Sequence, residues 1–349
     1  MFHVSYLVML YFGVQRGTKG GIHMPKLKKY HPVDSSVVSR FCGVRSFMRL
    51  PQIRTCEDVD FAIIGAPADT GSTFRPGQRF APAAIREMSM MLRAASLTFD
   101  INMFEYISGT DWGDANVSPC DLAKAHQAIQ EEISAIVAGN VIPVCLGGDH
   151  SITLPELRAV AAKYGPVALV HFDAHLDTYD IENGDTLTHG TPFYIACREG
   201  LIDTAHSIQV GIRGLFNTSA RKVSEDLGFK VIMAEEMREM GLDEVARQIN
   251  ERVGTARAFL TFDIDFVDPA FAPGTGTIEV GGFTSYEALK LLRSTKDLNY
   301  VAMDVVEVLP SFDPTQITAY LGGSIVHEFL AMLAYRKKNA ELRGESRDY

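Results

Sequence analysis

The segment ALVHFDAHLDTYD, residues 168–180, begins as a buried β-strand and ends in ionisable side chains. Its first residues, 168–170, are apolar, whereas Asp173, His175 and Asp177 follow at a two-residue spacing. Buried charge is tolerated in proteins when it is paired or bound to a metal ion. The segment therefore predicts that cations bind at the end of its strand.

Short apolar runs rich in β-branched residues alternate with helical patterns along the chain. The runs are residues 61–65, 141–148, 167–173, 207–212, 230–234, 258–263 and 300–306. The helix candidates are 82–94, 121–138, 154–164, 242–253, 285–296 and about 320–337. This alternation predicts an α/β fold with a mainly parallel sheet covered by helices on both faces. In such sheets ligands bind beyond the carboxyl ends of the strands.

The chain shows no internal repeat and no linker after residue 36, so we expect a single domain over residues 37–349. Residues 1–36 form an N-terminal extension that we expect to be poorly ordered. Its apolar stretch, Val4 to Val14, lacks a basic leader and a small-residue cleavage site, which disfavours a signal peptide. Met24 begins a sequence that is typical of a cytosolic start, so the first two dozen residues are interpreted as an upstream start or a disordered tail.

Composition narrows the class of partner. The net charge is −10 and the basic residues form no stripe, so nucleic acid is not expected to bind, whereas small cationic substrates fit the charge. The five cysteines are scattered and contain no CxxC pair, which indicates a reducing compartment and a cytoplasmic protein. No apolar run in the sequence reaches the roughly 18 residues that a membrane span requires, so no membrane partner is expected.

Two other predicted strands end in the same kind of side chain. Asp263 and Asp265 follow the run 258–262, and CLGGDHS places Asp149 and His150 after a third strand. Side chains two apart on an extended segment point the same way. If the backbone stays extended, the ionisable groups of each segment converge at the carboxyl edge of the sheet.

The charge of this group indicates the cations that would balance it. Four carboxylates and two imidazoles carry a formal charge of −4, which two divalent ions neutralise while sharing a bridging hydroxide. Ions about 3.5–4 Å apart lower the pKa of bound water from about 15.7 towards 7. Oxygen and imidazole donors without thiolate favour two Mn²⁺ ions over zinc, with Ni²⁺, Co²⁺ or iron as alternatives. The candidate ligands are His150, Asp173, His175, Asp177, Asp263 and Asp265.

The motifs around these residues together resemble the ureohydrolases, the arginase and agmatinase family, and are most similar to its agmatinase-like members. The resemblance covers about residues 37–337 and rests on GAPADTGSTFRPGQRFAPAAIREMS, LGGDHS, HFDAHLDTYD, HGTPFY, TFDIDFVDPAFAPGTGT and VAMDVVEVLP. It implies a three-layer α/β/α arginase-like fold and a dinuclear manganese site at the C-terminal strand ends that hydrolyses a guanidinium to urea and an amine. It also implies a homotrimer or homohexamer, and a hetero-oligomer with a paralogue is an alternative.

The resemblance also implies a role for each matching residue. One ion would be held by His150, Asp173, Asp177 and Asp263, and the other by Asp173, His175, Asp263 and Asp265, so that Asp173 and Asp263 bridge. Asp265 is counted as catalytic as well as a ligand. His189 matches the proton-shuttling histidine, Glu307 matches the carboxylate that receives the guanidinium, and Thr277 lies in the substrate-side loop.

These roles agree with the chemistry of the side chains. A guanidinium stays protonated because its pKa is above about 12, and a carboxylate such as Glu307 binds it through paired charge-assisted hydrogen bonds. Attack gives a tetrahedral intermediate whose amine must be protonated to leave, and a histidine such as His189, titrating near neutrality, suits that transfer.

Several residues depart from the family pattern and bear on the substrate. Arginases carry an acid for the α-amino group after VGIR, where this chain has Gly214, so arginine is disfavoured and agmatine is preferred. Leu176, Ile278 and the loop 178–188 also differ and flank the substrate. Guanidinobutyrate, guanidinopropionate, free guanidine and a biguanide-like compound stay open as substrates.

Two other classes of protein remain as hypotheses. An amide hydrolase of the deacetylase kind shares this fold with a single zinc ion, although the full set of six ligands argues against it. A ureohydrolase-like subunit that contributes structure or regulation to a partner is the other. Metal stoichiometry tests the first, and urea release by the chain alone tests the second.

Overall fold

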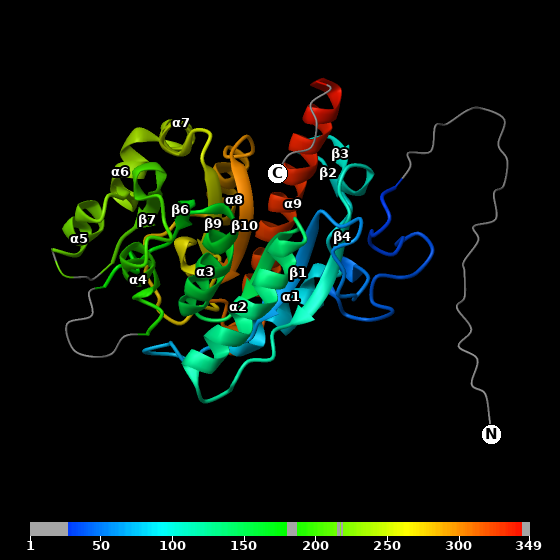
Figure 1. Ribbon diagram of the computed structural model, residues 1–349, viewed down its shortest axis with the longest axis horizontal. Coiled ribbons are helices and arrows are strands. Elements are labelled where there is room, and N and C mark those ends of the chain that lie inside the picture. The colour runs from blue at the N-terminus through cyan, green and yellow to red at the C-terminus, as the bar shows by residue number, and fades with distance from the viewer. Residues whose placement is uncertain (1–26, 180–186, 215–216, 218, 344–349) are drawn as a thin grey trace.

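A parallel sheet forms the centre of the protein. The computed structural model describes residues 27–179, 187–214, 217 and 219–343. Eight strands of this part of the chain lie in the order β4 (Gly109–Asp114), β1 (Phe61–Ala66), β5 (Ile142–Gly147), β10 (Asn299–Val306), β9 (Arg257–Asp263), β6 (Ala168–Phe172), β7 (Ile208–Ile212) and β8 (Lys230–Met233). All seven neighbouring pairs are parallel (Figure 1). A separate antiparallel pair joins β2 (Ala95–Ser96) and β3 (Ile101–Asn102).

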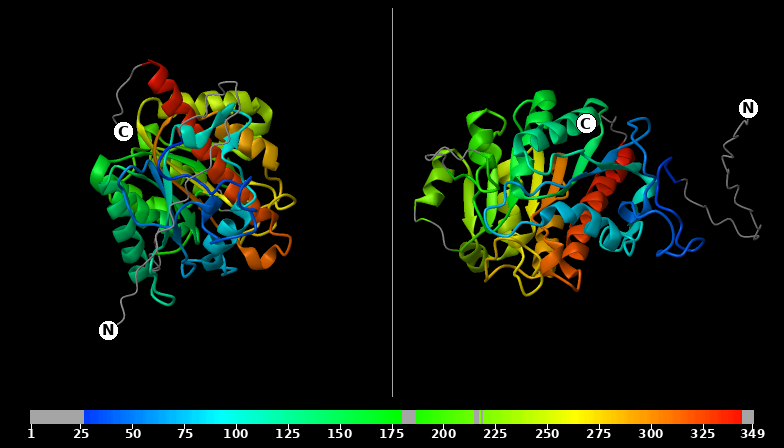
Figure 2. Two further views of the ribbon diagram at one scale, coloured as in Figure 1. Left: turned by 90° about the vertical axis from the view of Figure 1, so that its right-hand side faces the viewer. Right: turned by 90° about the horizontal axis from the view of Figure 1, so that it is seen from below.

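Helices cover both faces of the sheet, which confirms the predicted three-layer α/β/α fold (Figure 2). One layer contains α1 (Ala81–Ser89), α6 (Ala234–Met240), α7 (Leu242–Val253), α8 (Ser285–Arg293) and α9 (Ile317–Arg343). The other contains α2 (Leu122–Ala138), α3 (Thr153–Tyr164), α4 (Pro192–Arg198) and α5 (Ala220–Asp226). Short 3₁₀ helices are η1 (Phe47–Arg49), η2 (Gln78–Phe80), η3 (Met103–Glu105), η4 (His150–Ile152), η5 (Thr204–His206), η6 (Ile264–Phe266) and η7 (Pro310–Phe312).

The continuous apolar character of the strands follows from this two-sided burial. In β6, Ala168, Val170 and Phe172 join one hydrophobic core, whereas Leu169 points into the other. Each strand therefore needs apolar residues at odd and even positions, which is why the seven predicted runs all form strands.

The edge strand β4 was not predicted because its sequence, GTDWGD, combines two glycines with two aspartates. Its Asp111 is buried, and its carboxylate oxygens accept hydrogen bonds from Arg86 Nε at 2.8 Å and Nη2 at 2.9 Å. The strand thus depends on a bidentate ion pair with helix α1, which is a tertiary contact.

Two predicted helices end earlier than expected. Helix α1 ends at Ser89 rather than residue 94, because Ser89 Oγ donates to Arg86 O and accepts from Met48 N. Helix α8 ends at Arg293 rather than residue 296, where Ser294 Oγ donates to Lys290 O at 2.9 Å. In α1 the serine hydroxyl takes the place of a backbone N–H at Arg86 O, whereas in α8 the hydroxyl of Ser294 shares Lys290 O with its own backbone N–H.

Helices α4, α5 and α6 were not predicted, since seven residues each are too few to show a helical period. The terminal helix α9 begins at Ile317 and extends to Arg343, beyond the expected range of about 320–337. It is long and apolar enough to cross a membrane by length and composition, but 78% of its most apolar window is buried inside the protein. This burial on all sides is typical of a core helix.

The described part of the N-terminal extension lies against the domain. Lys28 N donates to Phe104 O at 2.8 Å, and Tyr30 N donates to Ser108 Oγ at 3.1 Å. Residues 1–26, with the apolar stretch discussed above, lie outside the described residues.

Gly148 ties three strand ends together beside the carboxyl edge of the sheet. Its N–H donates to Ala66 O at 3.0 Å, and its carbonyl accepts from Glu307 N at 2.9 Å. A Cβ at this position would lie 2.0 Å from Ala68 O and 2.7 Å from Ala66 O. Only glycine allows this close backbone approach.

We expect Gly148→Ala to lower the free energy of unfolding by about 1–3 kcal/mol, because the added methyl group forces the strand ends apart. Gly323→Ala is the matched control: its Cβ would meet Leu92 Cδ1 at an ordinary 3.6 Å inside helix α9, where alanine gains up to about 1 kcal/mol over glycine. Denaturant unfolding of both variants measures the difference, and equal stabilities would contradict the role of Gly148.

Candidate active site

Three central strands deliver the ionisable side chains to one place. Strands β5, β9 and β6 end at the same edge of the sheet, with β10 between β5 and β9. The structure brings together all six side chains predicted as ligands, at the carboxyl ends of these strands: His150, Asp173, His175, Asp177, Asp263 and Asp265. All are buried except His175, which is partly exposed.

The first cluster surrounds one nitrogen of His150. Its Nδ1 lies 3.1 Å from Asp173 Oδ2, 2.9 Å from Asp177 Oδ2 and 3.3 Å from Asp263 Oδ2. Despite these short distances, Nδ1 is buried without a hydrogen bond of acceptable geometry to any described residue. The other nitrogen, Nε2, lies 2.8 Å from Thr261 Oγ1, which fixes the ring so that Nδ1 faces the three carboxylates. Four donor atoms therefore point at one position.

The second cluster surrounds His175. Its Nδ1 lies 3.0 Å from Asp265 Oδ2 and 3.4 Å from Asp173 Oδ1. Asp265 Oδ2 is another buried atom without a hydrogen-bond partner among the described residues. Because Asp173 places one oxygen in each cluster, it spans both positions. Asp263 contributes Oδ2 to the first cluster, while its Oδ1 accepts a hydrogen bond from Asp265 N at 2.8 Å.

Tight turns, rather than extended backbone, bring these groups together. Strand β6 ends at Phe172, and Asp177 has a φ of 50°, in the left-handed region. Asp263 is the N-cap of η6, which carries Asp265. The expectation of extended segments is therefore wrong at both strand ends, although the side chains still meet.

The electrostatics of the clusters fit divalent cations. Burial, together with the charges of Asp265 and Asp173, raises the pKa of Asp263 well above its ordinary value. Burial alone would lower the pKa of His150, but the three carboxylates close to its Nδ1, those of Asp173, Asp177 and Asp263, raise it. This crowding of negative charge, the two unpaired donor atoms and the absence of thiolate among the six side chains suit two divalent ions such as Mn²⁺.

His171 lies in the same cluster but is not suited to bind metal. Its Nδ1 lies 2.9 Å from the amide nitrogen of Gln209, so Nδ1 must accept and Nε2 must carry the proton. Nε2 then donates to Asp173 Oδ2 at 2.6 Å. His171 therefore orients Asp173. A histidine inside an apolar run was the sole signal for it in the sequence.

The predicted catalytic pair lies beside the clusters. His189 Nδ1 is 2.9 Å from Glu307 Oε1, and the same oxygen accepts a hydrogen bond from His150 N at 2.9 Å. Burial alone would lower the pKa of His189, but the charge of Glu307 and its hydrogen bond raise it to about 9. Burial disfavours the Glu307 carboxylate, yet the charge of His189 holds the pKa of Glu307 below its ordinary value. The pair is therefore an imidazolium beside a carboxylate.

Gln78 is a site residue that the sequence did not reveal. Its side-chain amide, fully buried in η2, donates to Glu307 Oε2 at 2.8 Å and to Arg75 O at 3.0 Å. Glu307 itself has a φ of 62°, a strained conformation for a non-glycine residue. Gln78 thus helps to hold a strained carboxylate in place. It lies inside a quoted motif, but nothing in the local pattern distinguishes it.

A cavity of about 370 Å³ opens beside the two clusters and His189. Its volume is within the size range of small-molecule sites. Thr277 lies in its wall, as the sequence predicted for the substrate side. Residues 180–186 of the loop 178–188 lie outside the described residues. The described residues that line the cavity are Thr73, His175, Asp177, Tyr179, Thr188, His189, Gly190, Asp263, Thr277 and Glu279.

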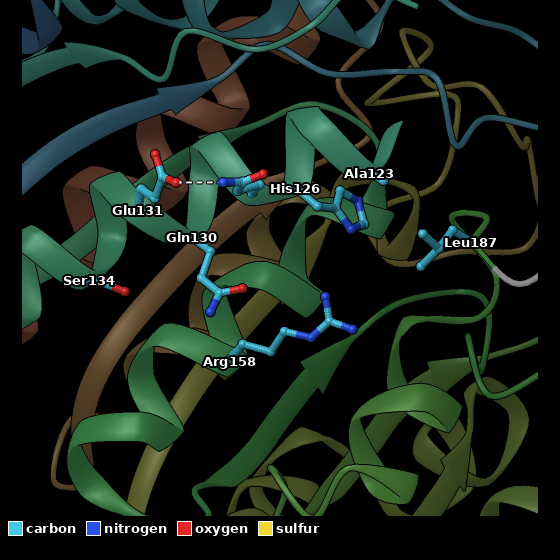
Figure 3. A pocket seen from close by; sticks show the side chains of 8 residues that line it. Ala123, His126, Gln130, Glu131, Ser134, Arg158 and Leu187 are labelled. Carbon is cyan, nitrogen blue, oxygen red and sulfur yellow. Dashed lines mark hydrogen bonds between the residues drawn. The ribbon is translucent and has the colours of Figure 1, made fainter. Parts of the chain in front are cut away.

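A second hollow, of about 480 Å³, lies between helices α2 and α3 and is not suited to this chemistry (Figure 3). Its Arg158 pairs with Glu199 at 2.6 Å, and Gln127 pairs with Glu131. Burial lowers the pKa of His126 to about 4, so that side chain is neutral. Arg158 and His126 therefore pair with Glu199 and Ser151, which lie outside the lining of this hollow.

Known proteins of one family are similar to this chain in sequence and in structure. The Arginase family model matches residues 59–332. The chain is 42% identical over 303 residues to a mitochondrial agmatinase from Gallus gallus, covering 86% of this chain and 89% of that protein. It is 37% identical over 308 residues to a guanidinobutyrase from Pseudomonas aeruginosa, covering 87% and 97%. A solved structure of a hypothetical agmatinase from Burkholderia thailandensis has a TM-score of 0.81 at 39% identity, covering 86% of this chain and 93% of that chain.

We expect Asp263→Asn to bind divalent metal at least 10–100-fold more weakly, since removing even an outer-shell partner costs that much. The fold should persist, because the substitution relieves repulsion among buried carboxylates. Elemental analysis after loading with manganese, together with circular dichroism, measures both. Asp243→Asn, on an exposed side chain of α7, removes the same charge and should bind like the wild type. Wild-type metal content in Asp263→Asn would contradict its role as a ligand.

Proposed function

The chain belongs to the arginase family, and on that premise we propose that this ureohydrolase cleaves the guanidinium of agmatine to urea and putrescine. The observation that carries the proposal is the position of the Glu307–His189 pair, 2.9 Å apart and beside two clusters of carboxylates and imidazoles. A cation-binding carboxylate, a proton donor and a site for divalent ions thereby lie next to one another, and His189 lines the cavity together with three of the predicted ligands, His175, Asp177 and Asp263.

The two clusters and the resemblance together support an assignment of the residues that would hold the ions. One set is His150, Asp173, Asp177 and Asp263, which form the first cluster. The other is Asp173, His175 and Asp265, which form the second cluster, with Asp263 added from the resemblance. When bound, a pair of divalent ions supplies an activated water at neutral pH. Asp265 is catalytic in this sense, through the ion that it would hold.

Glu307 binds and orients the guanidinium. Its Oε1 already accepts hydrogen bonds from His150 N and His189, whereas Oε2 accepts one from Gln78. A carboxylate has about four acceptor positions, so Oε2 has one left for a substrate N–H. The ionised carboxylate, buried at the end of β10, strengthens this charge-assisted bond and holds the substrate carbon beside the clusters.

His189 supplies the proton that the leaving amine needs. The charge of Glu307 keeps its imidazole protonated, and Nε2 lies 2.8 Å from the hydroxyl oxygen of Thr73, which also lines the cavity. Two bound cations would disfavour the imidazolium and lower the pKa of His189 towards neutrality, where a general acid is most effective. Thr277 also lines the cavity, and we assign it to substrate binding.

The same proposal includes the metal ions that the protein binds, its oligomeric state and its cellular compartment. Two Mn²⁺ per subunit fit the oxygen-rich donors, with Ni²⁺ or Co²⁺ as alternatives. A homotrimer or homohexamer, with a paralogue as an alternative partner, follows from the resemblance in sequence, and a cytoplasmic location follows from the scattered cysteines.

A panel of guanidino compounds tests the function. We expect the protein, loaded with manganese or separately with nickel, to release urea from agmatine faster than from guanidinobutyrate, guanidinopropionate, guanidine or a biguanide. The relative named guanidinobutyrase is the reason to include the acids. A colorimetric urea assay on the chain expressed alone is the measurement. If the protein at full metal occupancy released urea from none of these compounds, the proposal would be refuted.

His189→Ala should retain both ions and lose about 10²–10⁴-fold in kcat, the usual contribution of general acid catalysis. Because the protonated form is active, the wild-type rate should fall as pH rises through the pKa of His189, and the variant should lack this alkaline limb. His206→Ala, an exposed histidine, is the control and should behave like the wild type. Loss of metal together with the imidazole would show that the assignment is wrong.

A further inference from the structure

We propose that Glu279 selects substrates by receiving a cationic group at the end remote from the guanidinium. Glu279 was not identified from the sequence. The inference rests on the proposed function for the position of the guanidinium, and it names the residue that distinguishes amine-tailed from carboxylate-tailed guanidines.

Glu279 lies in the wall of the cavity, next to the second cluster. Its Oε1 is 3.7 Å from His175 Nε2, on the side of the ring opposite Nδ1, which faces Asp265. Its side chain is 21% exposed, so the carboxylate is partly desolvated and still reachable from the cavity. An ion pair formed at such a site is stronger than one on the open surface.

Gly214 and Arg213 lie next to Glu279 and define the position of its side chain and backbone. A Cβ at Gly214, whose φ is +94°, would lie 2.2–2.4 Å from the carboxyl atoms of Glu279, so the carboxylate fills the space of a side chain at 214. Arg213 Nη2 donates to Glu279 O at 2.8 Å, and Arg213 Nε donates to Val280 O at 3.3 Å. The loop that carries Glu279 is thereby tied to the strand end at Arg213.

A carboxylate lies at each end of the segment 276–279: that of Glu307 beside Gly276, and that of Glu279 itself. A Cβ at Gly276 would lie 3.5 Å from Glu307 Oε2, and Glu279 follows three residues later, beside His175. Three residues of chain span at most about 10 Å, a reach comparable to that of a four-methylene chain between two cations. Glu307 and Glu279 can therefore bind the two charged ends of one extended dication.

The charge of the cavity favours a cation at this end. Among the described residues that line it there is no lysine or arginine. Asp177 and Asp263 would be neutralised by the divalent ions, so Glu279 is the acid of this lining whose charge is left for a substrate. A tail that ends in a carboxylate would lie against Glu279 without a counter-ion from these residues. Like-charge repulsion then rejects guanidino acids while attraction retains the amine.

The geometry favours this role over orientation of a metal ligand. At 3.7 Å, Glu279 Oε1 is beyond hydrogen-bonding distance of His175 Nε2. The carboxylate therefore does not fix the ring in the way that Thr261 fixes His150.

The test uses Glu279→Gln, which keeps the shape and removes the charge, in the full metal-loaded chain. Three substrates of matched length differ at the tail: agmatine, with an amine; pentylguanidine, with a methyl group; and 4-guanidinobutyrate, with a carboxylate. Glu239→Gln, exposed on α6, removes the same charge away from the cavity and is the control.

We expect Glu279→Gln to raise the KM for agmatine at least tenfold with kcat within about threefold of the wild type. The kcat/KM for pentylguanidine should stay within about twofold, and that for 4-guanidinobutyrate should rise. Metal content should be unchanged. Unchanged constants for agmatine, or an equal loss with all three substrates together with loss of metal, would overturn the proposal.

Calorimetric binding of agmatine separates this inference from the proposed function, because it needs no turnover. If the wild type releases no urea but binds agmatine at least tenfold more tightly than Glu279→Gln, the function fails and the role of Glu279 stands. If the wild type releases urea and both proteins bind agmatine equally, the function stands and the role of Glu279 fails.

Discussion

Crowded and buried negative charge is the constraint on which this site depends. Asp173, Asp263 and Asp265 are almost fully buried at the ends of β6 and β9, and burial together with the charge of Asp173 raises the pKa of Asp263 and Asp265. Burial of such groups is costly unless cations compensate them. The parallel sheet creates the problem, since its strands end at one edge, and the same geometry makes the binding of two divalent ions favourable.

Groups around the clusters convert this charge into a defined arrangement. Thr261 and the His171–Gln209 pair determine which nitrogen or oxygen of His150 and Asp173 faces inward. Such outer-shell partners set the orientation and basicity of metal ligands. Beside them, the charge of His189 favours the ionised carboxylate of Glu307 in a buried place, and in the proposed function their hydrogen bond would couple binding of a cation to delivery of a proton.

Features that depend on local sequence were the ones predicted. Seven strands were identified because burial on both faces requires uninterrupted apolar runs, whereas β4 was missed because Arg86 compensates its Asp111 from another element. Gly214 was interpreted as the loss of an acid. In the structure the carboxylate of Glu279 fills the space beside that glycine, so negative charge is present there after all.

The amino-acid sequence by itself determined the fold class, the family and the six ionisable residues at the strand ends, because period and residue order are properties of neighbouring positions. The tertiary structure alone decided which atoms face the clusters, that His171 supports rather than binds, and that Gln78 and Glu279 belong to the site. The physical reason is that these roles depend on distances between side chains from separate segments. Packing sets those distances, and no local pattern encodes them.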